Sequence, residues 1–158
     1  MDEKDLYFMD EALKCAREAL SLGEVPVGAV IVCDGEIVSR GMNRRETGKN
    51  ALAHAEIEAI DKACRALGGW RLHKCTMYVT LEPCTMCAGA IINARIKRVV
   101  YGAPEERAGA FGSVIDVNFL PLNHTCELEG GVREDECRAL MREFFKNLRI
   151  KRGSSGEE

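Results

Sequence analysis

Several features that would exclude a compact domain are missing from the sequence. None of its apolar runs approaches the roughly 18 residues needed to cross a membrane. Residues 1–5 lack the charged-then-apolar order of a secretory signal. With 46% hydrophobic and 30% charged residues, the chain does not have the composition of a fibrous, collagenous or disordered protein. We therefore expect a single domain over residues 1–152, a flexible tail over 153–158 and a cytoplasmic location.

The chain also lacks a surplus of positive charge. Its 22 lysines and arginines stand against 25 aspartates and glutamates, a net charge of −3, so total charge gives no sign of a nucleic-acid partner. The distribution is uneven, because residues 1–24 hold seven acids and three bases whereas residues 138–152 hold six bases and one acid. If a polyanion binds, the C-terminal end is where we expect contact.

Cysteine is present, but below the density of a disulfide scaffold. Eight cysteines occur in 158 residues, and in a reducing compartment they should be thiols or metal ligands. Six are expected to behave as small buried apolar residues: Cys15, Cys33, Cys64, Cys75, Cys126 and Cys137. The other two, Cys84 and Cys87, belong to a motif discussed below.

Hydrophobic spacing predicts an α/β fold. An apolar stripe over residues 6–20 predicts a helix that ends at Gly23, and Asp34-Gly35 predicts a tight turn between strands 27–33 and 36–39. Farther on, the pattern predicts a helix from near His54 to Leu67, a strand at 76–81, a helix at 84–94, strands at 98–101 and near 126–128, and a final helix after Gly131. Strand, helix and strand over 76–101 form a parallel crossover, so the sheet should be mixed.

Two short motifs suggest metal chemistry. His54 and Glu56 stand at the start of a predicted helix, and Pro83-Cys84-Thr85-Met86-Cys87 spans the junction of a strand and the next helix. Zinc prefers imidazole and thiolate ligands, and a catalytic zinc site keeps one of four positions open. His54, Cys84 and Cys87 would supply three ligands. Glu56 would then carry protons between water and substrate, as hydrolytic deamination requires. Residues two apart on a helix point about 200° apart, so His54 must lie in an irregular first turn.

Other interpretations of these motifs exist. A C-x-x-C pair alone could be a redox pair or half of a structural zinc site. A closed knot could also form with Cys75 or Cys64 as fourth ligand. Such a knot explains neither the carboxylate two residues after the histidine nor the proline before Cys84.

From about residue 6 to residue 149, the chain resembles the bacterial tRNA-specific adenosine deaminases, a branch of the zinc-dependent cytidine and deoxycytidylate deaminase superfamily whose His-x-Glu and Pro-Cys-x-x-Cys signature it carries. The resemblance rests on residues 24–30, 43–45, 53–57, 78–90, 98–103, 112–113, 123–124 and 144–145. It implies a cytidine deaminase-like three-layer α/β/α sandwich with a sheet of about five strands. It also implies one Zn²⁺ per subunit, a homodimer, and conversion of adenosine to inosine at the wobble position of a tRNA anticodon.

The resemblance also assigns residues and leaves alternatives. Asn43 matches an asparagine that binds the target nucleoside, and the backbone N–H of Ala55 matches a donor to the base edge. From the sequence alone, Asn43 could instead be a loop residue in a left-handed conformation. Glu105 stands where these enzymes usually have aspartate, and residues 49–52 lack a common Asp-Pro or Asp-Ala. A deaminase of a free base or nucleoside, or a non-catalytic RNA-binding subunit, would carry the same fold.

Overall fold

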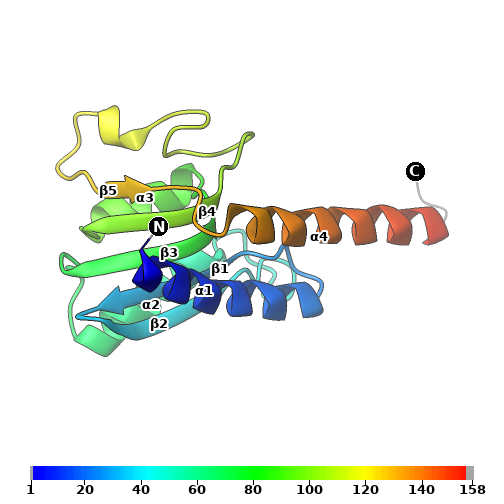
Figure 1. Cartoon of the computed structure of the whole chain (residues 1–158), viewed down its shortest axis with the longest axis horizontal. Coiled ribbons are helices and arrows are strands. Elements are labelled where there is room, and N and C mark those ends of the chain that lie inside the picture. The colour runs from blue at the N-terminus through cyan, green and yellow to red at the C-terminus, as the bar shows by residue number, and fades with distance from the viewer. Residues whose placement is uncertain (1, 156–158) are drawn as a thin grey trace.

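A computed structural model describes residues 2–155 and contains one five-stranded sheet between two layers of helices. The strand order is β2-β1-β3-β4-β5. In Figure 1, α1 and α4 cover one face of this sheet, and α2 and α3 cover the other. The predicted three-layer α/β/α sandwich with a mixed sheet is therefore confirmed.

The first half of the chain forms one helix and a hairpin. Helix α1 spans Glu3–Ser21, and strands β1 (Gly28–Cys33) and β2 (Glu36–Met42) are antiparallel. Asp34 and Gly35 connect them with φ values of 52° and 80°, the left-handed pair that a tight hairpin turn requires. The predicted turn is confirmed, and β2 continues three residues beyond the predicted end at 39.

The second half begins with the crossover that forms the centre of the sheet. Helix α2 (Ala55–Leu67) precedes β3 (Cys75–Leu81), and α3 (Thr85–Asn93) connects β3 to β4 (Arg98–Ala103). Strand β3 pairs antiparallel with β1 and parallel with β4, which confirms the mixed sheet. The carboxyl end of β3 therefore leads directly into α3, with Pro83 and Cys84 in the connection.

The last part of the chain differs most from the prediction. A short 3₁₀ helix, η1 (Val117–Phe119), precedes β5 (Glu127–Glu129), which pairs parallel with β4. Helix α4 (Glu134–Ser155) extends past the sheet, as Figure 1 shows. Residues 153–155 of the predicted flexible tail therefore continue this helix, and residues 156–158 lie outside the described residues.

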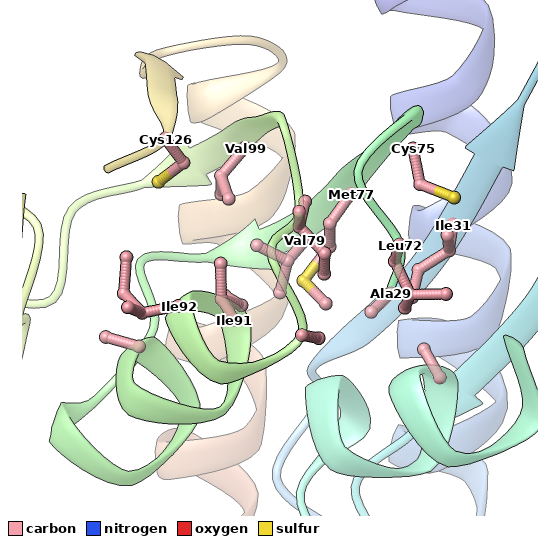
Figure 2. Packing of buried hydrophobic residues seen from close by; sticks show 14 of the residues in the cluster. Ala29, Ile31, Leu72, Cys75, Met77, Val79, Ile91, Ile92, Val99 and Cys126 are labelled. Atoms are coloured by element: carbon pink, nitrogen blue, oxygen red, sulfur yellow. The ribbon is translucent and has the colours of Figure 1, made fainter. Parts of the chain in front are cut away.

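Apolar side chains fill both interfaces between the sheet and its helices. Figure 2 shows the α2 and α3 side, where Met77 and Val79 of β3 lie among Ile31 of β1 and Ile91 of α3. Three of the six cysteines expected in the core are buried there or on the opposite face: Cys75, Cys126 and Cys137. The prediction is wrong for Cys15, Cys33 and Cys64, which pack at the core margins and keep part of their surface exposed.

Two glycines allow helices to approach the sheet closely. A Cβ at Gly28 would overlap the backbone of α1 at Ala12 and Ala16. At Gly41 it would overlap the Ala55 carbonyl oxygen and lie 2.8 Å from the Ala59 nitrogen, in the first turns of α2. The missing side chains therefore fix the helix-to-sheet distances. Over residues 2–155, no helix is both long and apolar enough to traverse a bilayer.

Candidate active site

The candidate site lies where the first turns of α2 and α3 meet the carboxyl end of β3. His54 caps the N-terminus of α2 with extended backbone angles (φ −87°, ψ 155°), so it lies before the regular helix. Cys84 caps α3 in the same way, and Cys87 is the buried third residue of that helix. This geometry lets His54 and Glu56 face one site although they are two residues apart.

Three potential metal ligands converge at this point. The Nδ1 atom of His54 lies 3.7 Å from the Cys84 sulfur and 3.5 Å from the Cys87 sulfur, and all three atoms lie within 4.8 Å of one another. Bonds of about 2.3 Å to sulfur and about 2.0 Å to nitrogen at a tetrahedral angle give about 3.5 Å between such ligands. The donor types and their spacing therefore fit zinc.

A fourth protein ligand is absent from this group among the described residues. Cys64 and Cys75, the alternatives for a closed zinc knot, are not members of it, nor is Glu56. His73 and His124 also lie elsewhere, and the Nε2 atom of His124 is 2.7 Å from the Ile96 carbonyl oxygen. Three protein ligands are the number found in catalytic zinc sites.

The two thiols influence each other's protonation. A hydrogen bond from Cys87 and another from His54 lower the pKa of Cys84 to about 3, against the cost of burial. The same pairing, together with burial, raises the pKa of Cys87. Both cysteines lie in the first turn of α3, where the helix dipole favours negative charge. The site therefore provides one thiolate readily, and a cation is needed to hold a second.

Glu56 is a buried carboxyl beside these ligands. It is the second residue of α2 and only 4% exposed. Burial is the main influence on it and raises its pKa to about 7, with the Cys84 thiolate adding to the shift and His54 opposing it. A group that changes protonation near neutral pH can both accept and return a proton.

A cavity of about 280 Å³ opens onto the ligands and Glu56. Asn43, Ala55, His54 and Cys84 all line it. The Asn43 amide is held by two local contacts, since its Oδ1 accepts from the Arg45 N–H at 3.1 Å and its Nδ2 donates to the Val25 carbonyl at 3.4 Å. Asn43 is not among the non-glycine residues with positive φ, so the left-handed alternative is wrong. Ala55 begins α2, where a backbone N–H has no acceptor within the helix.

A second hollow of about 770 Å³ runs from this cavity along α4. Leu81, Glu105, Met141 and Phe145 line both spaces. Its walls carry the basic side chains of Arg107, Arg138, Arg142, Lys146 and Arg149. The basic end of the chain therefore borders the candidate site rather than standing apart from it.

The two departures from the deaminase pattern have local explanations. The backbone N–H of Glu105 donates to Glu82 at 3.1 Å, and the Glu105 carboxylate accepts from the Arg107 N–H at 3.0 Å. Asn50 accepts from the Leu52 N–H at 2.9 Å, a turn that a side-chain oxygen of aspartate could equally close. Neither substitution displaces the three ligands.

Sequence reasoning missed Glu82, a pocket-lining carboxylate at the carboxyl end of β3. It is only 2% exposed, although glutamate is rarely buried without partners. The signal was an acidic residue directly after an apolar strand and before the Pro-Cys motif.

Comparison with known proteins agrees with this geometry. The sequence profile of the cytidine and deoxycytidylate deaminase zinc-binding region matches residues 2–103. The chain belongs to this deaminase family. The match includes β1 to β4 and all three candidate ligands.

Individual relatives extend the likeness to nearly the full length. A tRNA-specific adenosine deaminase of Bacillus subtilis is 48% identical over 155 residues, which cover 96% of this chain and 94% of the relative. One from Streptococcus pyogenes serotype M18 is 44% identical, with 97% of both chains covered.

Solved structures of the deaminase family show the same fold. One from a study of A-to-I editing by tRNA:A34 deaminases at the wobble position superposes with a TM-score of 0.79 at 44% identity, covering 85% of this chain and 98% of the other. A guanine deaminase from Nitrosomonas europaea gives 0.75 at 26% identity, covering 88% and 83%.

Proposed function

We propose that this chain hydrolyses adenosine to inosine at the wobble position of a tRNA anticodon and releases ammonia. The proposal rests on one observation: identity of 44–48% over nearly the whole chain to proteins named tRNA-specific adenosine deaminase, against 26–35% to guanine deaminases with the same fold. The zinc signature alone fixes the reaction class, whereas this full-length likeness favours the RNA substrate.

His54, Cys84 and Cys87 would hold the metal, one zinc ion per subunit. Bound zinc supplies a Lewis acid that acidifies a water molecule. The observed ligand spacing of 3.5 and 3.7 Å supports this assignment. The place of both cysteines in the first turn of α3 supports it too, because the helix dipole stabilises the negative charge they carry.

Glu56 would move the proton. Replacing the amine on C6 of adenine by oxygen requires two proton transfers: one from the attacking water to ring nitrogen N1, where inosine keeps it, and a second from the new hydroxyl group on C6 to the departing amine. A carboxyl that lines the cavity and has a pKa of about 7 can accept and donate in turn. Burial of Glu56 also keeps bulk water from competing for that proton.

Asn43 and the Ala55 N–H would bind the target base through hydrogen bonds. An amide side chain and a backbone donor suit the hydrogen-bonding edge of a purine, and both groups border the cavity. An anticodon-loop base can be turned out of its stack at modest cost, which brings C6 within reach of a recessed site.

The RNA around the target base would lie along α4. Lys146 and Arg149 border the larger hollow and suit phosphate contacts, whereas Arg44 is engaged by the Glu58 carboxylate at 2.6 Å. We also propose a homodimer whose two subunits both contact the RNA, in the cytoplasm, where a reducing environment suits eight free thiols.

The test is a deamination assay of the zinc-loaded protein. Inosine should form in an anticodon stem-loop with adenosine at the wobble position. Free adenosine, free cytidine and free guanine should not react. Glu56→Gln should slow inosine formation by a factor of about 10² to 10⁴ with zinc still bound, while Glu127→Gln, on the exposed surface of β5, should not change it. Turnover of guanine with none in RNA would discard the RNA substrate and keep the chemistry.

A further inference from the structure

Two irregular loops line the candidate pocket. The loop between β2 and α2 contributes Asn43 and Arg45, and the loop after β4 contributes Glu105 and Ala108. Regular helix or strand hydrogen bonding holds neither loop. Their positions therefore depend on other contacts, and a buried glutamate accepts backbone N–H groups from each loop.

Glu82 holds the loop after β4. Its Oε1 accepts from the Glu105 N–H at 3.1 Å and from the Ser113 hydroxyl, and its Oε2 accepts from the N–H groups of Phe111 at 2.9 Å and Ser113 at 3.2 Å. A Cβ at Gly109 would overlap the Glu82 carboxyl group, so the loop backbone lies directly against it. Both carboxylate oxygens thus serve two donors each.

Glu24 holds the other loop in the same manner. It is fully buried, and it accepts from the Glu46 N–H at 3.1 Å and the Thr47 N–H at 2.6 Å, one on each oxygen. Burial alone would raise its pKa, yet these backbone donors hold the pKa of Glu24 below its ordinary value. The side chain is therefore a carboxylate bound to a loop some twenty residues further along the chain.

We propose that Glu24 and Glu82 are positioning residues that hold the two pocket loops in the conformation that binds substrate. Neither would take part in the chemical step. Four hydrogen bonds converge on Glu82 and two on Glu24, so loss of Glu82 should have the larger effect. The effect on substrate binding rests on the proposed function, whereas the effect on loop order does not.

Loop order sets the fraction of the protein that can bind substrate. When a loop is ordered for only a fraction of the time, apparent substrate affinity falls by that fraction, while the bound complex reacts as before. A loosened loop should therefore raise KM and leave kcat nearly unchanged. A glutamine at position 82 loses two hydrogen bonds if its NH₂ group faces the N–H groups of Phe111 and Ser113. In the other orientation it loses the bond from the Glu105 N–H, while the Ser113 hydroxyl can accept from the NH₂ group instead of donating. At least one hydrogen bond to the loop is therefore lost in either orientation.

Limited trypsin digestion of the zinc-loaded protein tests loop order without reference to activity. Each loop carries exposed trypsin sites, Arg107 in one and Arg45 and Lys49 in the other. Glu82→Gln should accelerate cleavage after Arg107 by about tenfold and leave cleavage after Arg45 and Lys49 unchanged. Glu24→Gln should do the reverse, by a smaller factor.

Exposed Glu127→Gln is the matched control and should accelerate neither cleavage. Unchanged cleavage at the loop sites in both variants would overturn the proposal. So would equal acceleration at all three sites in either variant, because that indicates general destabilisation. Ser113→Ala, which removes only the hydroxyl donor to Glu82, tests the same loop more gently if Glu82→Gln fails to fold.

Steady-state kinetics on the anticodon stem-loop supply the second readout. We expect KM to rise about tenfold in Glu82→Gln, with kcat within about threefold of the unaltered protein and zinc content unchanged. A fall in kcat at constant KM, or loss of zinc, would assign Glu82 to the metal site and refute the positioning role. If the unaltered chain fails to deaminate RNA, the proposed function fails, while the trypsin pattern still decides whether these carboxylates order the loops.

Discussion

Two buried carboxyl groups on opposite faces of the sheet have contrasting environments. Asp5, in the first turn of α1, is 2% exposed and receives both arms of the Arg98 guanidinium at 2.8 Å and the Tyr78 hydroxyl at 2.7 Å. Those hydrogen bonds, Arg98 foremost, hold the pKa of Asp5 below its usual value. Glu56 is 4% exposed but forms no ion pair with a lysine or arginine among residues 2–155, and burial raises its pKa to about 7.

These environments suit the two carboxyl groups to different roles, Asp5 to stabilising the fold and Glu56 to proton transfer. A carboxylate whose charge is fully matched strengthens the fold and has no reason to exchange its proton. One that is buried without a matching cation costs stability, and it gains a pKa suited to proton transfer. The α1 face therefore carries the structural pair, and the α2 face carries the proposed proton carrier.

Removing the carboxyl group of Glu56, the proposed proton carrier, should have the largest effect. We expect Glu56→Gln to lower kcat by a factor of about 10² to 10⁴, because the proton carrier is lost. Its free energy of unfolding should not fall, since a buried group with a raised pKa is replaced by a neutral one of the same size. Turnover, zinc content and urea denaturation check the three statements. Activity above a tenth of the original would contradict the role of Glu56.

Removing the paired carboxyl should have the opposite signature. Asp5→Asn should lower the free energy of unfolding by about 2–4 kcal/mol, because the half-buried Arg98 loses its bidentate partner. The kcat of the folded fraction should stay unchanged. Urea denaturation with a parallel activity assay measures both quantities, and a variant as stable as the original would show that the pair contributes nothing.

The two groups should also respond to pH in opposite directions. The lowered pKa of Asp5 means that its contribution to stability is present above about pH 3.8, its ordinary pKa, and is lost as the pH falls below it. The raised pKa of Glu56 means that stability is lost as the pH rises from 4.5 towards about 7. Cys84 and Cys87 titrate as well. The contribution of Asp5 to stability is therefore measured as the difference between the unaltered protein and Asp5→Asn, and that of Glu56 as the difference from Glu56→Gln.

After a chelator has removed the metal, the free energy of unfolding of Glu56→Gln, relative to that of the unaltered protein, should therefore rise between pH 4.5 and 7. The deficit of Asp5→Asn should shrink as the pH falls from about 4 to 3. Parallel curves for variant and unaltered protein, in either range, would contradict the corresponding shift.

The smallest effect is expected from removing the Tyr78 hydroxyl, which donates to Asp5 beside Arg98. Tyr78→Phe removes one hydrogen bond to Asp5 and leaves the Arg98 contacts, so the free energy of unfolding should fall by about 1 kcal/mol. The pKa of Asp5 should rise towards its ordinary value. Denaturation at neutral pH measures the first effect, and NMR titration of the Asp5 carboxyl carbon measures the second. No change in either would mean that the Tyr78 hydroxyl is irrelevant to the pair.

The parts of the fold that follow from local chemistry were predictable. The hairpin turn at Asp34-Gly35 and the helix end at Gly68 (φ 73°) depend on positive φ angles, which glycine and an Asp-Gly pair favour. The end of α4 was not predictable, because Gly153 disfavours a helix but does not forbid one. Strand β5 gave a weak signal because only three residues pair.

In the candidate site the same division holds. His54, Cys84 and Cys87 could be grouped from sequence because their spacing matches zinc chemistry, and the structure brings them together. The roles of Glu24 and Glu82 could not be found in that way. Their donors lie 22 to 31 residues away along the chain, and all of them except the Ser113 hydroxyl are backbone N–H groups, which every residue type except proline offers.

The absent side chain at Gly41 has a consequence for genetics. A single added methyl would press against the Ala55 carbonyl and displace the turn that carries His54. In a selection for activity, Gly41→Ala should therefore be scored among the inactive alleles, beside changes to the ligands themselves. Because the atoms that the methyl group meets belong to the backbone of Ala55 and Ala59, no smaller side chain in the first turns of α2 can relieve the overlap, and suppressor alleles should not map to those two positions.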